Sequence, residues 1–408
     1  MFRTALLSAT IIASGFAPAF SEDATSLVDA FKNGDVNLNV RTRFESVSQD
    51  GVLNNASAFT IRTKLNYATK TFQGLSAFVE FEDSRNLAGE NYNNTINGNT
   101  IYPVVADPSS TELNQGYLTY TGVENLTLRV GRQAVNLNNQ RMVGSVGWRQ
   151  NDQTLDSFLA VYSPTEDLTA IYSYVWNVNR IFSDDHPFGN LDTDTHVFNV
   201  SYSGLGDIGK LSAYGVLVDL NDAPVYGLSS STYGVNFTGS QDVSDGVKFK
   251  YELEYATQKG IKDNPVHYKS DYFHAAASFV TNGFTLGGGY EVLGSNGVQS
   301  FKTPLATLHK YNGFADKFLS TPGLGLKDAY VKAGYKFSEG SMKGVSATVI
   351  YHDFSSEEGG VSYGSEVDWV LAVPIDDTFK LLFKGAHYSA DAHGTDTTKF
   401  WVQLGAAF

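Results

Sequence analysis

The sequence has no cysteine among its 408 residues. This absence excludes a disulfide framework, a thiolate metal site and a cysteine nucleophile. Proline is scarce at 10 residues, and charged residues make up only 18% of the chain. After the N-terminal segment, no apolar run approaches the roughly 20 residues that a membrane-spanning helix needs. A helical membrane protein is therefore not expected.

Basic residues are also few: 29 lysines and arginines stand against 43 aspartates and glutamates, which gives a formal net charge of −14 at pH 7. Proteins that bind nucleic acid need a basic face to displace counterions from phosphates, so no nucleic-acid partner is expected. All eight histidines follow residue 185, and none has HExxH or another zinc-ligand spacing, so we expect neither a metal nor a cofactor. The motifs GLGDIG at 204–209 and GVSYG at 360–364 lack a following helix and are expected to be connections between strands.

The first residues have the features of an export signal. Arg3 gives a positive start, residues 5–16 form a short apolar core, and Ala17-Pro18-Ala19 supplies small residues for cleavage. We expect cleavage after Ala19 or, as second choice, after Ser21, and a membrane anchor is less favoured because the core is too short to span. The expected organisation is a signal peptide at 1–21, a short periplasmic leader at 22–33 with one or two helical turns, and one barrel at 34–408.

Glycine (39), tyrosine (23) and phenylalanine (27) are abundant, and alternation with period two dominates the chain. Residues 36–45 and 247–255 each have one apolar and one charged face. Such alternation fits a soluble β-sandwich as well as a barrel. The pattern predicts eighteen strands, at about 34–48, 57–71, 75–84, 112–121, 125–133, 151–163, 167–180, 193–204, 208–220, 230–239, 246–258, 269–280, 283–294, 327–337, 344–354, 363–374, 377–389 and 397–408.

The connections between these strands alternate between long and short from first to last. A transmembrane antiparallel β-barrel explains this pattern, because one rim carries short periplasmic turns and the other carries long extracellular loops. A sandwich has no reason to alternate in this way. We therefore expect an all-β fold, a transmembrane barrel of about 18 strands, and a barrel of that size leaves an aqueous lumen.

The last expected strand places apolar residues on one face and ends at Phe408. A terminal strand of this kind looks like the signal that the outer-membrane assembly machinery recognises. We therefore expect the protein to lie in the bacterial outer membrane, in contact with its lipids.

Several segments resemble the alginate export family of outer-membrane porins. They are the opening hairpin at 41–45 and 58–65, the central motif GRQ at 131–133 with QR at 140–141 and GWRQNDQTLD at 147–156, and the late segment TLHKYNGFADKFL at 307–319 followed by GLKD at 325–328. The resemblance spans most of the mature chain. It implies an 18-stranded barrel with loops folded into the lumen, and it does not establish alginate as the substrate.

If the apolar faces of the strands meet lipid, the charged faces line the lumen. We expect pore-lining or substrate-contacting roles for basic residues of the wall and loops, namely Arg41, Arg43, Arg62, Lys64, Arg129, Arg132, Arg141, Arg149, Lys248, Lys250, Lys332 and Lys336. Charges in a narrow pore set ion preference and orient polar solutes. The alternative is a wet wall with ordinary solvated charges.

Two long connections, 134–150 and 295–326, are basic, whereas 85–111 and 354–363 are acidic; the shorter 259–269 segment is also basic. We expect 134–150 and 295–326 to fold inward and form a basic constriction that favours anions, because arginine can grip a carboxylate with two hydrogen bonds. In the competing structural interpretation, Trp148 packs the loop against the wall while Asp152 and Asp156 pair with arginines of the motif.

These expectations converge on an outer-membrane channel for passive passage of small polar, anionic solutes such as carboxylates or acidic saccharides, and not on an enzyme. The alternative is an outer-membrane barrel hydrolase with a Ser/His or Asp/His pair. Hydrolysis of lipid or peptide by the purified protein would favour that alternative.

Overall fold

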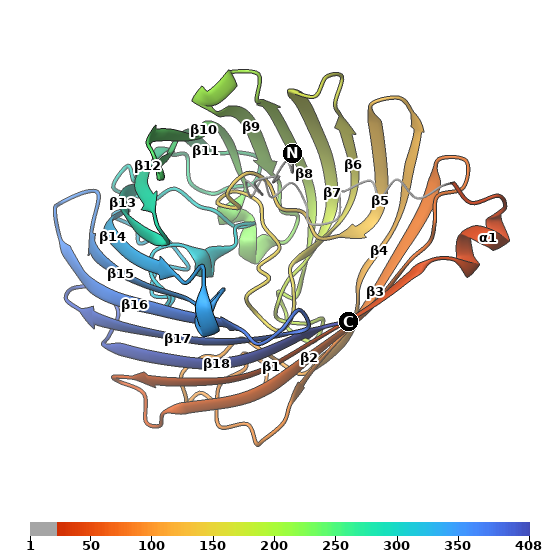
Figure 1. Ribbon diagram of the computed structural model, residues 1–408. Coiled ribbons are helices and arrows are strands. Elements are labelled where there is room, and N and C mark those ends of the chain that lie inside the picture. The colour runs from red at the N-terminus through yellow and green to blue at the C-terminus, as the bar shows by residue number, and fades with distance from the viewer. Residues whose placement is uncertain (1–22) are drawn as a thin grey trace.

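The computed structural model describes residues 23–408, so the predicted signal peptide at 1–21 lies outside the described residues. Eighteen antiparallel strands form one closed sheet (Figure 1). Closure follows from the first strand, which pairs with the second strand on one side and with the last on the other. A closed sheet leaves no unpaired edge, so every strand satisfies its backbone hydrogen bonds within the barrel.

The strands follow one another around the ring in chain order. Their bounds are β1 Asp35–Gln49, β2 Ala56–Ala68, β3 Leu75–Asn86, β4 Ser110–Val123, β5 Leu126–Gln133, β6 Thr154–Tyr162, β7 Leu168–Asn179, β8 Asn190–Tyr202, β9 Lys210–Val218, β10 Ser230–Ser244, β11 Val247–Gly260, β12 Lys269–Thr281, β13 Phe284–Leu293, β14 Leu326–Lys336, β15 Ser346–Ser355, β16 Ser362–Pro374, β17 Phe379–Ala390 and β18 Thr397–Ala407.

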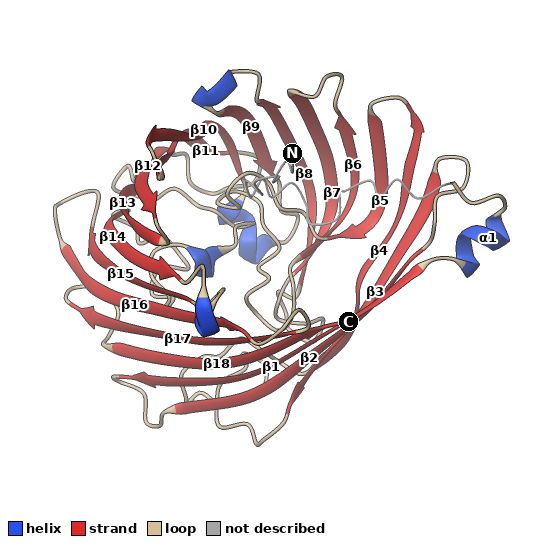
Figure 2. Cartoon of the chain, viewed as in Figure 1, coloured by secondary structure: helices blue, strands red, loops and turns tan. Residues whose placement is uncertain are grey.

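Among residues 23–408, helical structure is confined to short segments (Figure 2). They are α1 Leu27–Lys32 and the 3-10 helices η1 Gly206–Ile208, η2 Ala223–Leu228, η3 Leu308–Lys310 and η4 Gly340–Met342. The Ser26 side chain caps α1 by accepting a hydrogen bond from Asp29 N. Within residues 23–408, no helix has the length and apolar character needed to cross a membrane.

The strand faces divide by chemistry. Along β11, Leu253 and Tyr255 are about half exposed on the outer face, whereas Glu254 between them is buried on the inner face. The same division holds on β14, where Val331 is 60% exposed and Asp328 is buried inside. An apolar outer face and a charged interior are what a barrel needs in a lipid bilayer.

Aromatic rings lie over glycines on neighbouring strands. A Cβ atom on Gly239 of β10 would lie 2.3 Å from Cζ of Tyr251, and one on Gly385 of β17 would lie 2.3 Å from Nε1 of Trp369. Each glycine leaves room for the large ring of the residue that it pairs with on the adjacent strand, which helps fix the register between the two strands.

The expected strands match the observed ones in number and order, and two details differ. β10 continues to Ser244 rather than ending near residue 239, because Ser240 to Asp242 still pair with β11 although they are polar on both faces. The alternation of connection lengths fails at 337–345, a connection at the short-turn rim that contains η4 and is longer than 356–361 at the loop rim.

Candidate functional site

Two long connections lie inside the ring of strands (Figure 1). We name them loop A, residues 134–153 between β5 and β6, and loop B, residues 294–325 between β13 and β14. A parallel bridge joins Val143 of loop A to Leu305 of loop B, and Gly144 N donates a 2.8 Å hydrogen bond to Leu305 O. The two loops therefore form one unit, and both belong to the main buried apolar cluster.

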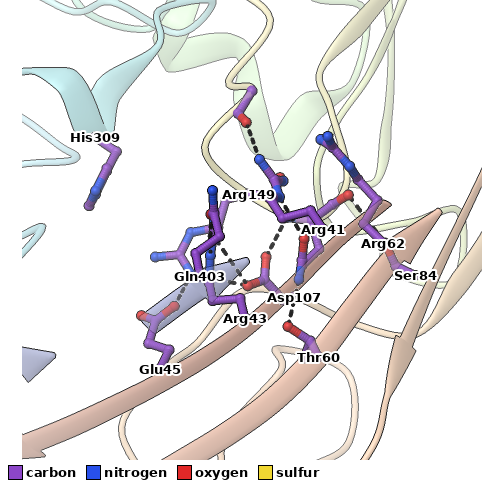
Figure 3. A network of polar contacts seen from close by, with 12 residues as sticks. Arg41, Arg43, Glu45, Thr60, Arg62, Ser84, Asp107, Arg149, His309 and Gln403 are labelled. Atoms are coloured by element: carbon purple, nitrogen blue, oxygen red, sulfur yellow. Dashed lines mark hydrogen bonds and ion pairs between the residues drawn. The ribbon is translucent and has the colours of Figure 1, made fainter. Parts of the chain in front are cut away.

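Arg149 is the charged centre of loop A. Its Nη1 lies 3.1 Å from a Glu45 carboxylate oxygen and 3.5 Å from one of Asp107, and its Nη2 lies 3.2 Å from Asp316 of loop B. Burial alone would lower the pKa of Arg149, but the three carboxylates outweigh it and raise that pKa above its usual value. Figure 3 shows this guanidinium among its partners from the wall.

Arg41 and Arg43 of β1 point toward the same place (Figure 3). Arg41 donates hydrogen bonds to the Gly147 carbonyl at 2.8 Å and to Oε1 of Gln150 at 2.9 Å, so it holds the loop backbone. Arg43 donates to Oε1 of Gln403 at 2.6 Å and lies 3.9 Å from Asp107. The Arg43 guanidinium also lies 4.0 Å from the centroid of the Trp148 ring, so both buried arginines fix loop A to the wall.

Asp152, near the end of loop A, pairs with the wall cations Arg62 and Lys64 of β2. Burial would raise the pKa of Asp152, but the two cations lower it below its usual value. Lys64 also lies 3.0 Å from Glu82. These wall residues thus bind the loop and each other.

A stack of rings and cations joins both loops to β17. The Trp148 ring of loop A stacks on His309 of loop B at a centroid separation of 4.6 Å. Nζ of Lys384 lies 4.1 Å from the Trp148 centroid and 3.2 Å from that of Phe314. Such contacts between a cation and aromatic faces are strongest where water is excluded.

His309 lies between an aspartate and a lysine. Its Nδ1 lies 2.6 Å from Asp316, and its Nε2 lies 2.7 Å from Nζ of Lys384. This arrangement fits a neutral ring that donates from Nδ1 and accepts at Nε2. Burial lowers the pKa of His309 well below its usual value; Lys384 adds to that effect, while Asp316 opposes it.

Arg141 anchors the other side of loop A. Its Nε lies 2.8 Å from Glu291 of β13, and Nη2 donates a 2.9 Å hydrogen bond to Oδ1 of Asn312 in loop B. The Tyr311 ring lies 4.6 Å from the guanidinium carbon. Burial alone would lower the pKa of Arg141, but Glu291 raises it.

The remaining predicted residues lie away from this cluster. Arg132 pairs with Asp156 at 2.8 Å, and strand alternation gives Arg132 the parity of outward-facing Val130, so we do not assign this pair to the pore. Arg129 lies over the Tyr117 ring at 4.1 Å on the inner face. The lysines at 248, 250, 332 and 336 face inward near the short-turn rim.

Several residues of the cluster were not singled out from the sequence. Glu45, Asp107, Asp316, Lys399 and Gln403 all contact the arginines of this cluster or their partners. The segment 307–319 carried the resemblance and contains His309 and Asp316, but nothing in its spacing relates Asp316 to Arg149 or Lys399. These contacts join residues far apart in the chain, so only the folded barrel brings them together.

A closed 18-stranded barrel with an apolar outer face and inward-folded loops defines an outer-membrane porin. The chain belongs to the alginate export family, whose model matches residues 33–290. The protein is thus a porin of the bacterial outer membrane, and its outer face contacts lipid. A comparison with curated proteins gave no match.

Solved structures share the fold at low sequence identity. Acinetobacter baumannii OccAB4 superposes with a TM-score of 0.73 and 14% identity, covering 92% of this chain and 98% of that one. Pseudomonas aeruginosa OccK1 (OpdK) has a TM-score of 0.74 and 11% identity, covering 93% and 99%. A structure of OpdK with vanillate has a TM-score of 0.73 and 12% identity with the same coverage.

Proposed function

We propose that this porin passes small polar solutes passively and favours anions, namely carboxylates or acidic saccharides. The observation that carries the proposal is a pair of inward lysines on the lumen wall. Lys250 of β11 and Lys332 of β14 lie in one cross-strand row, separated by Ser278 and Gly287. The small residues between them leave both ammonium groups open to the lumen, where Lys250 is exposed and Lys332 half-buried.

These lysines differ from the loop arginines in their partners. Within residues 23–408 no carboxylate lies within ion-pair distance of Lys250 or Lys332, whereas Arg141 and Arg149 are buried against acids. Glu252, the next inward residue of β11, already accepts hydrogen bonds from Asn139 and Asn236. A passing anion therefore meets two ammonium groups that form no ion pair, although the charged Glu252 carboxylate lies one inward position further along β11, and the arginines serve to position the loops.

Two comparisons support an acidic solute. The family is named for the export of alginate, which is a polyuronate. A structural neighbour, OpdK, has been solved with vanillate, an aromatic carboxylate. Both names belong to compounds with carboxylate groups, which lysine attracts as a point charge.

Reversal potentials across a planar bilayer in a salt gradient test the proposal. A charge about 6 Å from a permeating ion contributes about 0.7 kcal/mol in water before screening and about 0.4 kcal/mol at moderate salt. Because it favours the anion and disfavours the cation equally, each lysine changes the anion-to-cation permeability ratio about 3-fold, and the Lys250→Gln/Lys332→Gln variant should lower that ratio about 10-fold. Lys259→Gln, on the outward face of β11, is the matched control.

Cation selectivity of the unmodified protein contradicts the proposal. A double variant that matches the Lys259→Gln control would instead show that the lysine row does not carry the preference.

The hydrolase alternative gains no support from the described part of the chain. The two buried histidine–aspartate pairs are His309 with Asp316 and His352 with Asp328. Their other ring nitrogens face Lys384 and Asp368, and no serine hydroxyl contacts either ring among residues 23–408.

We also propose that the assembly machinery recognises Phe408. Phe408 is 62% exposed at the short-turn rim, and its backbone pairs with Leu38. Reduced membrane assembly of Phe408→Ala, measured as the heat-modifiable folded fraction, is the expected result; unchanged assembly contradicts it.

A further inference from the structure

The outer face of the barrel is hollowed over β11, β12 and β13. Ala275, Ala277 and Gly288 form its floor, because Ala277 pairs directly with Gly288 and Ala275 lies two residues along the same face. Leu253 on one side and Tyr290 on the other form walls. The resulting groove has a volume of about 700 Å³.

This groove opens within the apolar band of the barrel. Its neighbours Leu253 and Phe279 are about half exposed on the same outer face. Small residues on the floor between large side chains leave an apolar depression that a flat neighbouring surface would not contact. A flexible chain can enter the depression and make the dispersion contacts that would otherwise be missing. The shape therefore fits an acyl chain.

Two lysines stand above the groove at the loop rim. Lys259 of β11 and Lys269 of β12 are direct cross-strand partners, and both are exposed on the outward parity of Tyr255 and Phe273. These residues bound the basic 259–269 segment, which the pore does not use. Like charges directly opposite one another on adjacent strands are destabilising, so this pair favours a bound anion.

No anion of the chain itself satisfies the pair. The ion-paired lysines within residues 23–408 are Lys64, Lys70, Lys248, Lys262 and Lys399, and neither Lys259 nor Lys269 is among them. Asp271 shares their face of β12 but forms no ion pair with either.

The spacing between lysines and groove matches one lipid leaflet. Six residues separate Leu253 from Lys259, which is about 20 Å along a strand. At the usual strand tilt of roughly 40° this is about 15 Å along the membrane normal, or half of the roughly 30 Å hydrocarbon core. A lipid with its headgroup at Lys259 would thus place its chain in the groove.

We propose that this face binds one phosphorylated lipid of the outer leaflet, with its phosphate at Lys259 and Lys269 and one acyl chain over Ala277 and Gly288. Basic residues near a membrane surface attract anionic headgroups. The site is independent of which solute the pore carries.

Native mass spectrometry of the purified protein in detergent tests the site. The probes are bisphosphorylated lipid A and the same lipid after dephosphorylation. The unmodified protein should retain one lipid A and bind the dephosphorylated form at least 10-fold more weakly. Lys259→Gln/Lys269→Gln should abolish that difference, whereas Lys262→Gln in the neighbouring loop should preserve it.

The groove has its own variant and control. Ala277→Leu fills the floor and should weaken binding of both lipids, whereas Ala160→Leu on the outward face of β6 should not. Heat-modifiable migration in gels verifies that each variant is folded, and the lysine variant, at the exposed rim, tests the proposal even if Ala277→Leu does not assemble.

Three results would overturn the proposal. The first is equal binding of both lipids by the unmodified protein. The second is lipid A binding that survives both the lysine and the Ala277→Leu substitutions. The third is a defined dimer in place of the lipid adduct, lost in Ala277→Leu, which would assign the groove to a second copy of the chain.

Discussion

Asp316 is the residue on which the docking of loop B most depends. Its Oδ2 lies 2.8 Å from Nζ of Lys399 on β18 and 3.2 Å from Arg149 of loop A, while Oδ1 faces His309. Burial would raise the pKa of Asp316, but these neighbours outweigh it and hold the pKa well below its usual range. Asp316→Asn keeps the shape of the side chain, removes its charge and replaces one of its two acceptor oxygens by an NH2 group.

The cost of this substitution follows from what it leaves behind. Lys399 is 94% buried and has Asp316 as its ion-pair partner, so the variant leaves an uncompensated buried ammonium group. Breaking a buried ion pair by removing one partner costs about 3–5 kcal/mol. Since about 1.4 kcal/mol is tenfold, the ratio of docked to undocked loop B should fall by roughly two to four orders of magnitude.

Single-channel recording at neutral pH measures this change. Undocking opens the lumen, so the variant should show larger and fluctuating conductance, and trypsin should cleave loop B after Lys310 or Lys317. Asp263→Asn, at an exposed acid in the connection between β11 and β12, is the matched control. A folded Asp316→Asn variant with steady conductance and a protected loop B would refute the reasoning.

Two further outcomes follow from the same structure. Burial and Lys384 lower the pKa of His309 below its unfolded value of about 6.5, although Asp316 opposes them. The neutral ring therefore stabilises loop docking fully above about pH 6.5, and this stabilisation is lost as the pH falls through the pKa of the folded protein. Conductance fluctuations should grow at acid pH, and they should grow less in His309→Gln. Gly385→Val should destabilise the barrel by about 1–3 kcal/mol, because its side chain would overlap the Trp369 ring; urea unfolding in vesicles measures the loss, and an unchanged midpoint would contradict it.

The barrel could be predicted from the sequence because its causes are local. Alternation in segments such as 247–255 is set by the two faces of a strand, and strand number and order follow from counting such segments. β10 was predicted too short because Ser240 to Asp242 are polar on both faces, so alternation ends before pairing does. Arg132 was expected to line the pore because it belongs to the GRQ motif at 131–133, but it has the opposite parity to inward-facing Arg129 and the same parity as outward-facing Val130.

The loop cluster depends on contacts that no periodicity reveals. Arg149 and Asp316 are 167 residues apart, and Lys384 looks like any inward lysine until His309 and Phe314 surround it. The sequence indicated that the basic loops matter, but charge alone does not separate a cation that meets solute from one that holds a loop. Burial and partners make that distinction, and both arise from closure of the barrel.

The different roles of Arg149 and Lys250 have a chemical cause. A loop held at a fixed position needs several directed bonds at once, and the planar guanidinium of Arg149 binds three carboxylates in this way. A solute in transit must be attracted without being trapped, and a flexible, hydrated ammonium such as that of Lys250 does this with little directional demand. The net charge of −14 does not oppose such a preference, because screening limits each charge to about 8–10 Å in salt and a solute responds to the wall beside it.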